Sequence, residues 1–128
     1  MQFALKKIEA AKKANFYTEA FIKHYLLNLA LIHYILKILA PQAEIENMKA
    51  KAVIKLFMKE MAAHPEMKAV IHKRSLKAVQ LWNDKADTFF KQLKMGQDKS
   101  ATALLSESEK VFALLKISTH KGLSKATK

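Results

Sequence analysis

Residues 79–93 read VQLWNDKADTFFKQL, and the spacing of their apolar side chains decides the fold class. The apolar residues step by three, four, three and four positions, which places them on one face of an α-helix: Val79, Trp82, Ala86, Phe89 and Leu93. The opposite face is polar and includes Lys77, Gln80 and Thr88. Proline suits a first helical position and glycine a helix end, so we predict one helix from Pro65 to about Leu93, ended by Gly96.

The rest of the chain shows the same helical spacing. We expect further helices over 3–14, 17–39, 49–63 and about 101–117, and no stretch alternates with period two over five or more residues. Asn15 is expected to cap the second of these helices, because its side chain can bind free backbone N–H groups. The predicted fold is therefore all-α, a mostly antiparallel bundle of four to five helices.

Length and composition favour a single domain. The chain has 128 residues, of which 51% are apolar, which is enough for one packed core and too few for two. We assign the domain to residues 1–117 and treat 118–128 as a basic, frayed tail.

The helix over 17–39 is apolar almost all round. Only 13 residues separate Lys23 from Lys37, whereas a bilayer needs about 20, so we expect no transmembrane segment. A bundle of this size does not cover such a helix on every side. We therefore expect a homodimer in which a second chain covers it.

Few catalytic or cofactor chemistries fit this composition. There is no cysteine, and two glycines are too few for GxGxxG. His24 and His33 are nine residues apart, on opposite sides of one helix, and Glu60 with His64 makes at most a weak metal site. Acidic pairs such as Asp84 with Asp87 lie among lysines, where they are solvated. We predict a protein that is not an enzyme and has no cofactor or metal.

The charge points to an anionic partner. Lys and Arg total 23 against 11 acids, and residues 49–128 carry 17 of these cations against seven acids. The candidate nucleic-acid-binding residues are Lys73, Arg74 and Lys77 near the start of the helix over 65–93, with Lys91 further along the same stripe. An ordinary solvated face is the alternative, because acids interrupt the stripe. Only one cation is arginine, which favours attraction to the phosphate backbone over readout of base sequence.

The aromatic residues of this helix have two possible roles. Trp82, Phe89 and Phe90 lie beside lysines and could stack on bases, but their spacing favours a core. Phe90 and His72 lie at the edge of that seam, where we expect partial exposure.

Two stretches resemble a known family: NFYTEAFIKHYLLNLALIHYILKIL (15–39) and HKRSLKAVQLWNDKADTFFKQL (72–93). In this order, over residues 1–115, they resemble the higher-eukaryote-and-prokaryote nucleotide-binding (HEPN) helical bundles. Active members carry an Arg-polar-x(4–6)-His ribonuclease motif, usually across a homodimer. After Arg74 there is no histidine at any of residues 75–91, which include every position that the motif allows, and 85–91 has no arginine either. The resemblance therefore implies a member without the ribonuclease centre.

These observations lead to one preferred function and two alternatives. The preferred function is non-catalytic binding of RNA, DNA or another anionic partner through a lysine-rich helix face, in the cytoplasm. The first alternative is a protein–protein interaction module, an adaptor or antitoxin-like bundle with no nucleic-acid role. The second is binding to a membrane surface through the helix over 3–14, which carries Lys6, Lys7, Lys12 and Lys13.

Overall fold

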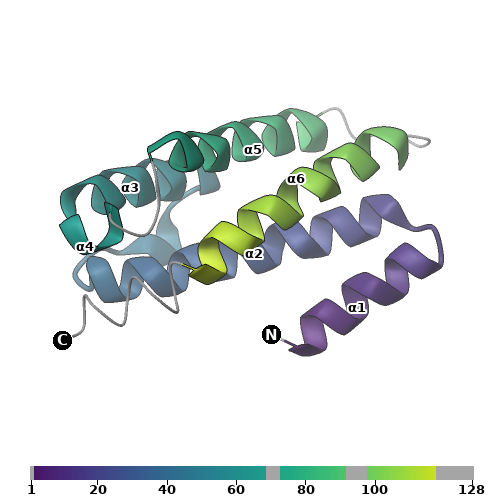
Figure 1. Cartoon of the computed structure of the whole chain (residues 1–128), viewed down its shortest axis with the longest axis horizontal. Coiled ribbons are helices and arrows are strands. Elements are labelled where there is room, and N and C mark those ends of the chain that lie inside the picture. Colours follow the sequence, from purple (N-terminus) through teal and green to yellow (C-terminus); the bar gives the residue numbers. More distant parts are fainter. Residues whose placement is uncertain (1, 69–72, 92–97, 118–128) are drawn as a thin grey trace.

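The protein is a bundle of helices (Figure 1). The computed structural model describes residues 2–68, 73–91 and 98–117. Within these residues all regular structure is helical: α1 (Gln2–Lys13), α2 (Tyr17–Leu39), a 3₁₀ turn η1 (Ile45–Asn47), α3 (Ala50–Ala63), α4 (Pro65–Lys68), α5 (Lys73–Lys91) and α6 (Asp98–Ile117). The predicted all-α class is confirmed.

Helix α2 lies at the centre of the bundle and contacts α1, α3 and α6, with its most extensive contact to α6 (Figure 1). The pairs α1–α2, α3–α5 and α5–α6 are antiparallel. Helix α3 runs in the same direction as α2, because the connection over 40–49 carries the chain back along the bundle before α3 begins. Helix α6 also runs parallel to α2.

The helix predicted from Pro65 to Leu93 corresponds to two described helices, α4 and α5. Residues 69–72 and 92–97 lie outside the described residues, so the predicted end at Gly96 and the predictions for Leu93 and His72 fall there, as does the tail over 118–128. Where α5 is described, its polar face is exposed as predicted at Lys77, Gln80 and Thr88.

The turn between α1 and α2 differs from the prediction. The N-cap of α2 is Phe16, which makes no side-chain capping bond. Asn15 instead ends α1, with a left-handed φ of 63°. The Phe16 N–H then donates to the Ala11 carbonyl at 2.8 Å and the Asn15 N–H to the Lys12 carbonyl at 3.0 Å, which is the hydrogen-bond pattern of a left-handed helix end. Asparagine tolerates this conformation better than most residues, and that property outweighs its use as an N-cap.

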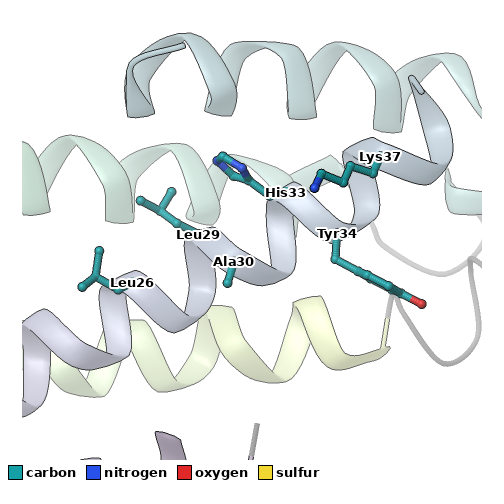
Figure 2. A pocket seen from close by; sticks show the side chains of 6 residues that line it. All are labelled: Leu26, Leu29, Ala30, His33, Tyr34 and Lys37. Carbon is teal, nitrogen blue, oxygen red and sulfur yellow. The ribbon is translucent and has the colours of Figure 1, made fainter. Parts of the chain in front are cut away.

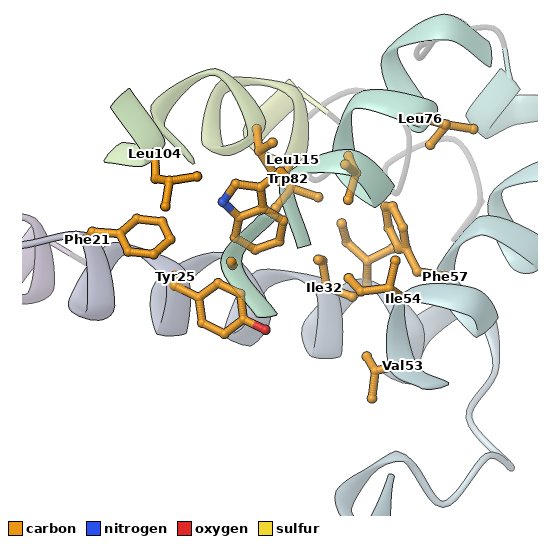
Figure 3. Packing of buried hydrophobic residues seen from close by; sticks show 14 of the residues in the cluster. Phe21, Tyr25, Ile32, Val53, Ile54, Phe57, Leu76, Trp82, Leu104 and Leu115 are labelled. Atoms are coloured by element: carbon orange, nitrogen blue, oxygen red, sulfur yellow. The ribbon is translucent and has the colours of Figure 1, made fainter. Parts of the chain in front are cut away.

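The core forms between α2 and the helices around it, with Phe21 and Tyr25 on one side of the cluster and Phe57 beside Ile54 on the other (Figure 3). Trp82 is 1% exposed and Phe89 is buried, so the seam of α5 is core as predicted, and Phe90 is half-buried. The Phe21 and Phe89 ring centroids lie 5.4 Å apart in an edge-to-face contact, and Tyr25 lies 5.0 Å from Trp82. Full burial of each such side chain contributes about 1.5–3 kcal/mol.

Of the helices that the structure describes, α2 alone is long and apolar enough to cross a membrane by length and composition. Core helices of water-soluble bundles share this property. In this bundle α2 packs against α1, α3 and α6, makes ring contacts with α5, and buries polar side chains such as His24 and Asn28 toward α6.

Candidate functional site

The outer face of α3 is basic. Lys51, Lys55 and Lys59 follow one another at four-residue intervals, and all three are exposed. The other exposed residues of this helix are alanines: Ala52, Ala62 and Ala63. None of the three lysines has an ion-pair partner among the described residues. We call Lys51, Lys55 and Lys59 the α3 lysine face.

The sequence-predicted residues on α5 are placed differently. Lys77 is exposed and has no ion-pair partner among the described residues. Lys91 is exposed, but its Nζ lies 3.0 Å from Asp87 Oδ2, so part of its charge is neutralised. Lys73 and Arg74 lie in the first turn of α5, and their side chains lie outside the described residues. Lys77 and Lys91 are 14 residues, or about 21 Å, apart along the helix.

Other cations are also held in ion pairs. Lys85 Nζ lies 2.8 Å from Glu107 Oε1, and Lys23 Nζ lies 2.8 Å from Glu19 Oε1. Lys12 lies 3.4 Å from Glu109. These pairs cancel charge locally, whereas Lys51, Lys55 and Lys59 form no ion pair among the described residues and keep their full charge toward a polyanion.

A cleft of about 510 Å³ opens where the start of α3 meets the end of α5. Lys49 and Lys51 line one wall, and Asp84, Asp87 and Lys91 line the other. The first lysine of the α3 lysine face and the last predicted residue of α5 therefore share this cleft. The two acids make the cleft less attractive to a polyanion than the outer face of α3.

A buried hydrogen bond supports this cleft. The Tyr25 hydroxyl donates to Asn83 Oδ1 at 2.7 Å, which joins α2 to α5, and both residues line the cleft. Burial, with a smaller contribution from the charge of Asp87, raises the pKa of the Tyr25 hydroxyl to about 12. The hydroxyl therefore stays protonated and keeps donating at neutral pH.

A second buried polar group joins α2 to α6. His24 Nδ1 lies 2.8 Å from Ser108 Oγ, and Asn28 Nδ2 donates to Ser108 Oγ at 2.9 Å and to its carbonyl at 3.0 Å. All three residues are buried. Burial lowers the pKa of the His24 imidazole below its usual 6.5, and the charges of Glu109 and Lys12 act in opposite directions on it. A serine beside a histidine suits nucleophilic chemistry, but this pair is enclosed and orients α2 on α6.

The histidines considered as metal ligands are not brought into a metal site within the described residues. His64 Nε2 lies 3.4 Å from Glu60 Oε2, and its Nδ1 lies 3.2 Å from Glu66 Oε1. Within the described residues, no three His, Cys, Asp or Glu side chains are grouped so that they could hold a metal ion. His24 and His33 are not brought together: His24 is bonded to α6, whereas His33 lies on the outward side of α2.

The first helix was the candidate for membrane-surface binding. Its Ile8 and Ala11 are buried, so much of the apolar side of α1 is already covered within the bundle. Phe3 is exposed, with Lys7 Nζ 4.6 Å from its ring centroid.

Sequence reasoning directed attention to α5 and missed the α3 lysine face. The four-residue spacing of these lysines is visible in AKAVIKLFMKE (50–60), where positions 51, 55 and 59 lie on the side of the helix opposite its apolar residues. The sequence does not show which lysines have acidic partners, because some of the ion pairs join helices that are far apart in the chain. Examples are Lys85 with Glu107 and Lys12 with Glu109.

Comparison with known proteins gives no relative to set beside this geometry. No family model, no curated protein and no solved structure matches the chain.

Proposed function

We propose that this protein is a non-catalytic binding protein that engages nucleic acid through the lysines of α3, extended by those of α5. The observation that carries the proposal is the α3 lysine face, three exposed lysines without an acidic partner among the described residues. A phosphate backbone is the extended anion that such a row of point charges attracts, without sequence readout.

The spacing of the lysines supports contact with a polymer. Successive lysines of this face advance by four residues, or about 6 Å along the helix axis, and rotate by about 40°. The small side chains of Ala52, beside Lys51, and of Ala62 and Ala63, beyond Lys59, leave room for a backbone to approach closely at the two ends of the row. Lys77, on the adjacent helix α5, and the pair Lys73 and Arg74 at its start would extend the contact.

The resemblance to HEPN bundles is consistent with this proposal. Its two stretches correspond to α2 and α5, which contact each other through Tyr25 and Asn83. We propose a member that binds without cleaving, since the ribonuclease motif is missing from the sequence. A cytoplasmic location and a choice between RNA and DNA belong to the same proposal.

The test compares two variants of equal net charge. Labelled single-stranded and duplex RNA and DNA are titrated by fluorescence anisotropy at roughly 50 and 200 mM salt. The site variant is Lys51→Glu/Lys55→Glu/Lys59→Glu. The matched control is Lys6→Glu/Lys7→Glu/Lys13→Glu, which changes three exposed lysines of α1 that also form no ion pair among the described residues.

The site variant should lose at least about tenfold in affinity and reduce the salt slope by about three, one for each lost phosphate contact. The control should change affinity much less. Equal losses in both variants would mean that the charge of +12 acts as generic attraction, and the proposal would be wrong. Replacing Lys73, Arg74 and Lys77 by Glu then measures how far the contact extends onto α5.

The second candidate function is a protein–protein interaction module. It is favoured by Leu81, which is 58% exposed beside a groove of about 170 Å³ between α5 and α6. Trp82, Val111 and Leu114 also line this groove, which would take an apolar side chain of another protein. Wild-type protein that binds none of the four nucleic acids would favour this candidate over the first.

A further inference from the structure

The outward side of α2 carries a row of apolar side chains that no described helix covers. Leu26 and Tyr34 are 58% and 55% exposed, with Ala30 exposed between them. Figure 2 shows these residues following one another along α2 toward Lys37, with Leu29 and His33 on one edge and Tyr34 on the other. Together they line a shallow groove of about 420 Å³, which we call the α2 outer face.

The charges at the two ends of this face are opposite. Glu19 lies near the start of α2 and Lys37 near its end, 18 residues or about 27 Å apart. Eighteen residues are five full helical turns, so both side chains project in the same direction as Leu26 and Ala30. Both charges are already paired within the chain, since Glu19 Oε1 lies 2.8 Å from Lys23 Nζ and Lys37 Nζ lies 3.6 Å from Glu46 Oε1. On the line of Leu26 and Ala30, the face therefore has a carboxylate at one end and an ammonium group at the other, each in an exposed ion pair that can extend to a second copy.

We propose that the α2 outer face binds the same face of a second copy of this chain, with the two α2 helices antiparallel. In the favoured register the two-fold axis passes at the level of Asn28. Glu19 of each copy then lies opposite Lys37 of the other, and Leu26 lies opposite Ala30, a large side chain against a small one. This proposal is independent of nucleic-acid binding.

Other arrangements bring like charges together. A parallel pair places Glu19 against Glu19 and Lys37 against Lys37. An antiparallel pair shifted so that Ala30 meets Ala30 places Lys23 against Lys37. Exposed ion pairs add little affinity, but like-charge contacts select against wrong registers.

The shape of the face favours the same register. Tyr34 of one copy comes level with Ile22 of the other, and its ring extends toward the Lys37 end of its own helix (Figure 2). In an antiparallel pair that direction leads toward the start of the other α2. A groove of about 400 Å³ lies there, lined by Phe16, Ile22 and Lys23 together with Thr18 and Glu19. Phe16 is itself 59% exposed and would be covered.

The first experiment measures mass by sedimentation equilibrium over a range of protein concentrations, without nucleic acid. Wild-type protein should reach the mass of a dimer, and Leu26→Arg should raise the dimer dissociation constant at least about tenfold. Phe3→Arg is the matched control, because Phe3 is also an exposed apolar residue, lies on α1 outside the residues that line the α2 outer face, and gains the same charge. A monomeric wild type, or an equal effect of both variants, would overturn the proposal.

The second experiment tests the register by disulfide formation, which the absence of native cysteine makes clean. Glu19→Cys and Lys37→Cys proteins are oxidised separately and as a mixture. The mixture should give the mixed dimer, and each variant alone should give little, since its two cysteines would lie about 27 Å apart. Efficient crosslinking of Glu19→Cys to itself would indicate parallel helices and overturn the proposal.

A third measurement separates a second copy from a membrane. Monomeric wild-type protein that sediments with vesicles of phosphatidylcholine and phosphatidylserine, and loses this property in Leu26→Arg, would assign the face to lipid and overturn the proposal. Because none of these measurements involves nucleic acid, failure of the dimer leaves the α3 lysine face untouched.

Discussion

The two sides of α2 differ in an unexpected way. The side that faces α5 and α6 buries polar groups, with His24 and Asn28 bonded to Ser108 and Tyr25 bonded to Asn83. The side that faces solvent carries Leu26 and Tyr34. Burial in this helix therefore follows position in the bundle and hydrogen-bond partners, and not hydrophobicity alone.

The inner side of α2 therefore determines how the chain folds, whereas the outer side is available for interactions. Changes on the inner side should lower the free energy of unfolding by amounts set by lost packing and hydrogen bonds. Changes on the outer side should leave the monomer nearly as stable as before.

Phe21→Ala should lower the free energy of unfolding by about 4 kcal/mol, because Phe21 is fully buried and contacts Phe89 and Phe90. Leu26→Ala, on the outer side, should change it by no more than about 0.5 kcal/mol. Urea unfolding at a concentration where the protein is monomeric measures both. Similar losses in the two variants would show that both sides of α2 contribute alike to folding.

Tyr25→Phe tests the bond between α2 and α5 through its pH dependence. The pKa of Tyr25 is about 12 in the folded chain and about 10 when unfolded, so its contribution is complete below pH 10 and is lost as pH rises toward 12. The stability advantage of wild type over Tyr25→Phe should fall across this window by up to about 2–3 kcal/mol. A constant difference between the two proteins from pH 9 to pH 11.5 would show that the hydroxyl is not held in its protonated form.

Asn28→Ala should lower the free energy of unfolding by about 2 kcal/mol, since it removes both bonds that Asn28 donates to Ser108. Asn28 Oδ1 has no hydrogen-bond partner among the described residues, which limits the loss. Ser108→Ala keeps the bond to the backbone carbonyl and should cost less. If Ser108→Ala lowers the free energy of unfolding more than Asn28→Ala does, the bond between Ser108 and His24 contributes more to stability than the bonds from Asn28.

His24 should make the smallest contribution, visible as a pH effect. Its folded-state pKa is lowered by burial, so its stabilising contribution is present above the unfolded pKa of about 6.5 and is lost as pH falls below it. Wild-type protein should lose stability between pH 7.5 and 5.5, and His24→Gln should lose less over the same interval. Equal slopes for the two proteins would show that His24 does not titrate differently on folding.

Much of the fold could be predicted from the sequence because helical spacing is a local property. The seam through Val79, Trp82 and Ala86 gave the core side of α5, and the bounds of α2 were predicted at both ends. The parallel direction of α2 and α3 could not be predicted, because it depends on the path of the connection over 40–49. The prediction that Asn15 caps α2 was wrong, because asparagine suits both the start of a helix and a left-handed helix end.

The candidate site was predicted less well than the fold. The excess of lysine and its concentration after residue 48 are sequence properties. Which lysines stay unpaired is a property of packing, since the partner of Lys85 lies 22 residues away and that of Lys12 lies 97 residues away. The sequence therefore indicated an anionic partner, but it predicted the binding residues on α5 and not on α3.

The contact between α2 and α6 also has a consequence for synthesis of the chain. His24 and Ser108, which meet in that contact, are 84 positions apart. At roughly 5–20 residues per second, a ribosome takes about 4–17 s to add those positions. Throughout that interval the nascent chain holds an apolar helix whose most extensive binding surface does not yet exist. During this delay the side of α2 that later packs against α6 stays open to solvent or to a chaperone at the ribosome, and the α2–α6 contact forms only after this long wait.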